Sequence, residues 1–208
     1  VIHSYIYIYL TNYLTNYLTN YLSLSLSICS GMGMTGTQAI SVTSISFMLA
    51  IILLVKLFTP AMKDCKVIYC YRFGSGLMVA SVLLVPSIYN IQEACRGASE
   101  IYSWVFVIGL YTCINLGSLW SLLCTIVMVN NSSYKWERGT VFGGAETVAC
   151  IGKLIGILLA KYFYSAALYS DWVWPFDASI YWYSLGIFLY ISGRLTNYLP
   201  KAILVSYT

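Results

Sequence analysis

Charged residues are scarce in this chain of 208 residues, and their scarcity excludes most soluble folds. Only 9% of the residues are Asp, Glu, Lys or Arg, whereas 60% are hydrophobic. A soluble domain carries about 25% charged residues, so this sequence has too few of them to cover a globule in water. The composition therefore predicts an integral membrane protein whose principal partner is the lipid bilayer.

Side chains that bind metals or transfer protons are also rare. The chain has one histidine, His3, and its seven cysteines are scattered without a CxxC pair. Metal sites need several such ligands close together, and isolated cysteines in apolar runs pack as small hydrophobic side chains. A glycine-rich phosphate loop and a nucleophile elbow are absent from the sequence as well. We therefore expect no enzyme activity, no metal and no cofactor.

Long apolar runs, in contrast, are abundant. Five of them occupy residues 38–59, 67–89, 102–129, 140–164 and 180–199. Each reaches the ~20 residues with which a helix, rising ~1.5 Å per residue, crosses ~30 Å of hydrocarbon. The runs predict an all-α integral membrane fold, a multi-spanning helical bundle. Pro60 directly follows the first run, and we expect it to end that helix.

The connections between the runs alternate between basic and acidic. The first connection, the third connection and the C-terminal segment contain the bases Lys63, Lys66, Arg72, Lys135, Arg138, Arg194 and Lys201. The second and fourth contain Glu93, Arg96, Glu100, Asp171 and Asp177. Because basic loops stay in the cytosol, we expect a cytoplasmic C-terminus, with residues 201–208 as its tail. The net charge of +4 is explained by this topology, so nucleic acid is not an expected partner.

Aromatic residues cluster where the runs begin or end. They include Trp104, Trp136, Trp172, Trp174, Tyr181 and Trp182. Tryptophan and tyrosine are enriched at both membrane–water interfaces. We therefore expect these side chains to form an aromatic belt at the bilayer surface.

Residues 1–34 have low complexity. The tetrapeptide Thr-Asn-Tyr-Leu repeats three times without interruption between Thr11 and Leu22. A four-residue period drifts ~40° per repeat around a helix, so the repeat makes no stable apolar stripe. We interpret this segment as degenerate or repeat-expanded, with the replacement of a membrane helix as the alternative. The whole chain is interpreted as the C-terminal piece of a larger protein.

Two ionisable residues lie inside the fourth run. At ~1.5 Å per residue, Glu146 lies ~9 Å and Lys153 ~20 Å from the cytoplasmic start of this helix. Their seven-residue spacing places both on one helix face, within ~20°. One interpretation is a structural pair, or pairs with other helices; the other is contact with an anionic substrate or a proton-coupling relay. A charge at the bilayer centre costs at least ~2.5 kcal/mol, so either role requires a protein or aqueous environment.

Small and polar residues predict how the helices associate. Gly144, Gly152 and Gly156 recur at multiples of four residues, a spacing that lets a neighbouring helix approach closely. Asn115 lies in the middle of the third run. A hydrogen bond to another helix is its expected role, and contact with a substrate or coupling ion is the alternative.

The stretch from Val127 to Gly156, VMVNNSSYKWERGTVFGGAETVACIGKLIG, resembles a late segment of major facilitator superfamily transporters. The tetracycline-resistance and zinc-induced-facilitator-like branch is the most similar. A paired-Asn turn, a loop ending in Arg-Gly-Thr and a small-residue step carry the resemblance: Asn130, Asn131, Ser132, Arg138, Gly139, Thr140, Gly143 and Gly144. Lys153 stands where those proteins have arginine. One departure is Ile157, which follows Gly156 where the family has proline.

The resemblance implies that the five runs are helices eight to twelve of that fold. Residues 35–200 would then be the C-terminal transporter half, and residues 1–34 a degenerate seventh helix. The implied function is secondary transport of a small solute by alternating access, around a site between two six-helix halves. The missing N-terminal half is then an expected partner. The alternative is a truncated membrane protein fragment that does not transport.

Overall fold

The computed structural model describes residues 36–64, 66–88, 100–132, 137–144 and 179–198, together with scattered helical positions between 146 and 162. These residues form helices and short turns, and no strand occurs among them. The predicted all-α class is therefore confirmed for this part of the chain. The low-complexity segment, residues 1–34, and the tail, residues 201–208, lie outside it.

Four long helices account for most of the described residues. They are α2 (Gly36–Asp64), α3 (Val67–Leu84), α5 (Glu100–Ser132) and α7 (Ser179–Leu195), and a short 3-10 helix, η2 (Thr196–Tyr198), follows α7. An apolar run forms a helix in lipid because a helix satisfies its backbone hydrogen bonds within the segment. Among the described residues, three spans are long and apolar enough to cross a membrane: Ile40–Met62, Val67–Leu84 and Ile101–Asn131. They coincide with the first three predicted runs.

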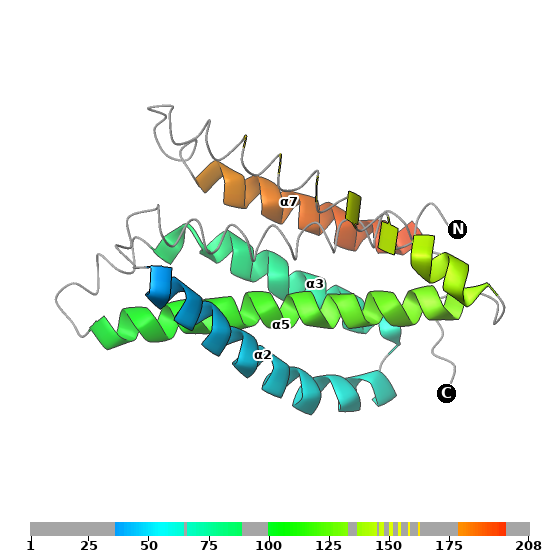
Figure 1. Ribbon diagram of the computed structural model, residues 1–208, viewed down its shortest axis with the longest axis horizontal. Helices are drawn as coiled ribbons and strands as arrows, with labels where there is room; N and C mark the ends of the chain where they lie inside the picture. Colours follow the sequence, from blue (N-terminus) through cyan, green and yellow to red (C-terminus); the bar gives the residue numbers. More distant parts are fainter. Residues whose placement is uncertain are drawn as a thin grey trace.

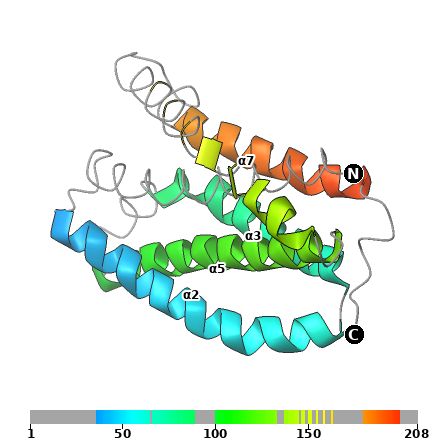
Figure 2. The same cartoon turned by 45° about the vertical axis from the view of Figure 1, so that its right-hand side comes forward.

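The helix α5 lies along α3 in the middle of the bundle, with α2 on one side and α7 on the far side of α3 (Figures 1 and 2). Figure 1 shows α2, α5 and α7 running in one direction and α3 in the opposite direction. Consequently α2 ends, α3 begins, and α5 and α7 end at the same end of the bundle. We call this the basic end, after its residues Lys66, Arg72, Arg138 and Arg194.

Two glycines allow α3 and α5 to approach each other closely. A Cβ atom on Gly117 would lie 2.7 Å from the carbonyl oxygen of Gly74, and one on Gly74 would lie 2.9 Å from Ser121 Oγ. Real Cβ atoms essentially never approach other heavy atoms this closely. Glycine is therefore required at this crossing, which is how small residues act at helix contacts in membranes.

Trp120 of α5 contacts both of the other membrane-length helices. Its ring packs edge-on against Phe58 of α2, with centroids 5.4 Å apart, and at a tilt against Phe73 of α3, at 5.3 Å. Cys70 and Cys124 are buried in the same hydrophobic cluster, so these cysteines pack as small side chains. This cluster holds α2, α3 and α5 together near the basic end.

The prediction that Pro60 ends the first helix is wrong, because α2 continues through Pro60 to Asp64. Proline has no N–H to donate to the carbonyl four residues earlier, here that of Lys56. Membrane helices tolerate this loss because hydroxyl side chains and neighbouring helices compensate for it. Thr59, next to Pro60, donates its hydroxyl to the carbonyl oxygen of Val55, at 3.2 Å, which is a different carbonyl from that of Lys56.

Trp182, one of the residues expected in the aromatic belt, is only 3% exposed. Trp182 shares a face of α7 with Gly186 and Leu189, and this face packs against α3. A Cβ atom on Gly186 would lie 2.7 Å from a methyl carbon of Leu83. The ring therefore packs between two helices, and its position relative to the membrane surface stays a prediction.

Candidate functional site in the bundle interior

Polar side chains are buried along the length of α5. They are Thr112, Asn115, Ser118, Ser121 and Thr125. Thr112, Ser121 and Thr125 each donate a hydroxyl to the carbonyl four residues earlier in α5, at 2.7 to 2.8 Å. Such bonds satisfy a hydroxyl within its own helix and remove the cost of burying it in an apolar environment. These three side chains are therefore explained by structure alone.

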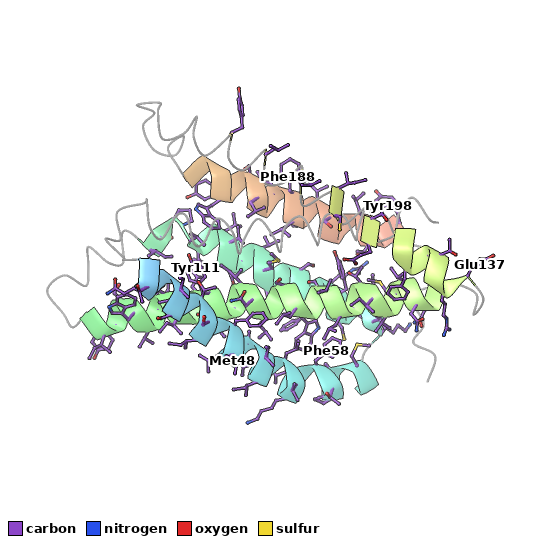
Figure 3. The ribbon with its side chains drawn as sticks, in the orientation of Figure 1. Met48, Phe58, Tyr111, Glu137, Phe188 and Tyr198 are labelled. Carbon is purple, nitrogen blue, oxygen red and sulfur yellow. The ribbon has the colours of Figure 1, made fainter. Side chains whose placement is uncertain are left out.

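Asn115 differs from its neighbours because its side chain is a carboxamide, which has both donor and acceptor groups. It lies near the midpoint of the span Ile101–Asn131 and is only 3% exposed. One turn earlier, Tyr111, labelled in Figure 3, is buried as well. The structure thus places this predicted site residue inside the bundle, at the depth of the bilayer centre if α5 crosses it.

The predicted pair of Glu146 and Lys153 is described only in part. Glu146 lies at an exposed helical position, and Lys153 lies outside the described residues. Thr147, next to Glu146, donates its hydroxyl to the carbonyl of Gly143 at 2.9 Å, which continues the helix that begins after Glu137. The pairing of Glu146 with Lys153 therefore stays a prediction.

Four described positions in the second half of the fourth run form an exposed stripe. Cys150, Leu154, Leu158 and Tyr162 follow one another at four-residue spacing, and all four are exposed. Gly143 and Gly144 are also exposed, with none of the described atoms within 4 Å of an added Cβ. Gly152 and Gly156, the other predicted packing residues, lie outside the described part. The apolar stripe is suited to contact lipid or another membrane segment.

The residues that carry the family resemblance flank one connection at the basic end. Asn130, Asn131 and Ser132 form the last turn of α5, and Arg138, Gly139 and Thr140 begin the next helical segment. Arg138, Gly139 and Thr140 are exposed. Figure 3 shows Glu137, which precedes them, at the same end of the bundle as Tyr198 of η2. Residues 133–136, between these two helical segments, lie outside the described part of the chain, so the predicted turn stays a prediction.

One partly buried polar contact at the basic end joins distant parts of the sequence. The side chain of Arg72 on α3 donates from Nε to the hydroxyl oxygen of Thr196 on η2, at 3.2 Å. The Thr196 hydroxyl in turn donates to the carbonyl of Gly193, at 2.7 Å, and Thr196 is fully buried. This contact fixes the end of α7 against α3.

Lys56 is a candidate that sequence reasoning missed. The predicted helix end at residue 59 placed Lys56 in the last turn of the first run, where a lysine needs no explanation. Because α2 continues to Asp64, Lys56 lies six residues, or ~9 Å, inside the span Ile40–Met62. The signal that could have revealed it is the apolar pair Ala61 and Met62 after Pro60, which prolongs the run.

No protein-family model matches this chain, and no curated protein or solved structure is significantly similar to it. The resemblance to major facilitator superfamily transporters therefore depends on the motif residues alone. The geometry of the bundle is the remaining basis for an assignment of function.

Proposed function

We propose that this chain is the C-terminal part of a membrane-spanning secondary transporter that moves a small solute by alternating access. The observation that carries the proposal is the position of Asn115. A carboxamide is buried near the midpoint of the longest membrane-length helix, and secondary transporters bind their substrates near the bilayer midplane. Asn115 is the residue that we assign to substrate contact.

The arrangement of the helices supports the membrane topology that the proposal requires. Helices α2, α3 and α5 alternate in direction, so α2 and α5 end at the same end of the bundle. The segments that follow these two helices are basic in the sequence. Under the positive-inside rule this end faces the cytosol. Within the major facilitator superfamily, α2, α3 and α5 would be helices eight, nine and ten.

A second candidate is a membrane protein fragment that does not transport. One observation favours it: the hydroxyls of Thr112, Ser121 and Thr125 are all bonded within α5. If Asn115 also serves only to hold helices together, the buried polar residues need no substrate. The two candidates differ in whether Asn115 determines a measurable flux.

The test is an uptake assay on the full-length gene product reconstituted in lipid vesicles. A panel of labelled sugars, amino acids, organic anions and lipophilic cations is screened first. For a transported solute, Asn115→Leu should lower uptake at least tenfold, while Asn115→Gln retains part of it. Ser44→Leu on the exposed face of α2 is the matched control and should leave uptake unchanged. Absence of uptake for every solute, or full uptake by Asn115→Leu, would support the fragment.

A further inference from the structure

The outward face of α2 is apolar and has no partner among the described residues. Only 22% of its membrane window is buried, compared with 67% for α5. The side chains Ile45, Leu49 and Ile52 on this face are 49%, 42% and 51% exposed. They follow one another at spacings of four and three residues, and Lys56 continues the series after four more. Spacings of three and four residues keep these side chains on one face of the helix, the α2 seam. Such a face can pack along a second helix at a small crossing angle.

Lys56 places a positive charge in this apolar seam. Its side chain is exposed, and no described residue forms an ion pair with it. A lysine at the bilayer centre costs ~2.5–3.5 kcal/mol on insertion scales, and less toward the interface. The charge favours a polar partner of opposite sign at this depth.

Snorkelling to the nearest surface explains Lys56 poorly. The basic end lies toward the C-terminus of α2, and the end of the span at Met62 is ~9 Å away. Helical side chains lean toward the N-terminus of their helix, so the stem of Lys56 leans away from that surface. Reaching the headgroups would require the side chain to bend back along its own helix.

A second copy of this chain also fits poorly on the seam. In a twofold-symmetric pair, the same face of α2 meets itself. Two Lys56 side chains would then face each other at one depth, and their repulsion in a medium of low dielectric constant opposes the pairing. The charge in the seam selects a partner of opposite sign.

We propose that the α2 seam, defined by Ile45, Leu49, Ile52 and Lys56, docks a membrane helix that carries a carboxylate opposite Lys56. The carboxylate lies ~9 Å from the cytosolic end of that helix. It neutralises Lys56, while the partner's apolar side chains cover Ile45, Leu49 and Ile52, which lie nearer the N-terminus of α2. The inference rests on the membrane placement in the proposed function and is independent of transport.

The test measures association between the full chain and a synthetic probe helix in lipid vesicles, by resonance energy transfer. The probe is a Leu/Ala transmembrane helix with one Glu at the stated depth, and otherwise identical probes carry Gln, Leu or Lys there. We expect the Glu probe to bind about tenfold more tightly than the Leu probe, which is the effect of a ~1.4 kcal/mol interaction. Lys56→Met should abolish this preference, and Lys56→Arg should retain it.

Lys66→Met, at the exposed start of α3, is the matched control and should keep the preference. Ile52→Trp should weaken binding of every probe, because it fills the seam. Equal binding of the Glu and Leu probes would overturn the proposal, and snorkelling would then explain Lys56. The proposal would also be overturned if the Lys56→Met variant still bound the Glu probe more tightly than the Leu probe. Protease protection of the reconstituted chain separates these outcomes from failure of the membrane placement. A chain that is degraded throughout does not span the bilayer, which contradicts the proposed function.

Discussion

Arg72 and Thr196 are 124 positions apart in the sequence, and the Nε of Arg72 donates a hydrogen bond to the Thr196 hydroxyl at 3.2 Å. The same hydroxyl donates to the carbonyl of Gly193. Thr196 therefore uses its hydroxyl as donor and acceptor at once, and in doing so connects the end of α7 to the first half of α3.

Thr196→Val should destabilise the protein by about 1 kcal/mol. Valine has the shape of threonine but loses the bonds to Arg72 and Gly193, and a net hydrogen bond contributes about that much. The matched control is Thr147→Val. Its hydroxyl makes only the local bond to Gly143, in an exposed position. Thermal unfolding in detergent measures both variants, and equal midpoints would contradict a special role for the Arg72 contact.

Gly117→Ala should separate α3 from α5. The added Cβ would lie 2.7 Å from the Gly74 carbonyl, a backbone atom that cannot rotate away. Overpacking of this kind costs about 1–3 kcal/mol, more than the ~1 kcal/mol that alanine gains over glycine in a helix. Gly109→Ala, with none of the described atoms within 4 Å, should be neutral or stabilising. A denaturant series with both variants checks the sign of each effect.

Trp120→Ala should lower the unfolding free energy by roughly 3–5 kcal/mol, because it leaves a cavity between Phe58 and Phe73. Trp120→Phe should cost much less. The indole Nε1 of Trp120 is buried without a hydrogen-bond partner among the described residues, so phenylalanine loses no bond. If Trp120→Phe is as unstable as Trp120→Ala, an undetected partner of Nε1 is responsible.

Epitopes inserted after residue 134 and after residue 171 should be detected on opposite sides of the membrane. The first lies in a basic connection and the second in an acidic one, and the positive-inside rule places them in the cytosol and outside, respectively. Antibody binding to intact and permeabilised cells distinguishes the two sides. Detection of both epitopes on one side would refute the topology and, with it, the proposed function.

The sequence was sufficient to predict the described helices but not all their limits. Apolar length predicted α2, α3 and α5 because lipid requires a helix wherever a run is long enough. The same reasoning misplaced the end of α2, since proline signals a break in water and is tolerated in a membrane helix. That one misplaced end hid the depth of Lys56.

Contacts between distant residues could not be read from the sequence. Gly74 and Gly117 lie in different runs, and neither belongs to the small-residue series that was used to predict packing. The bond between Arg72 and Thr196 likewise depends on how α7 lies against α3. Asn115 could be selected as a candidate from the sequence, because a carboxamide in an apolar run is visible without knowledge of the fold. The structure adds its burial, and its role stays a prediction.

The rings around Trp120 make it a natural optical reporter for this bundle. A single indole on α5 contacts Phe58 from α2 and Phe73 from α3. Any rearrangement that tilts one of these helices relative to the others must change the environment of that chromophore. The near-ultraviolet dichroism and emission of a variant that retains only this tryptophan would therefore report any such rearrangement without an attached label.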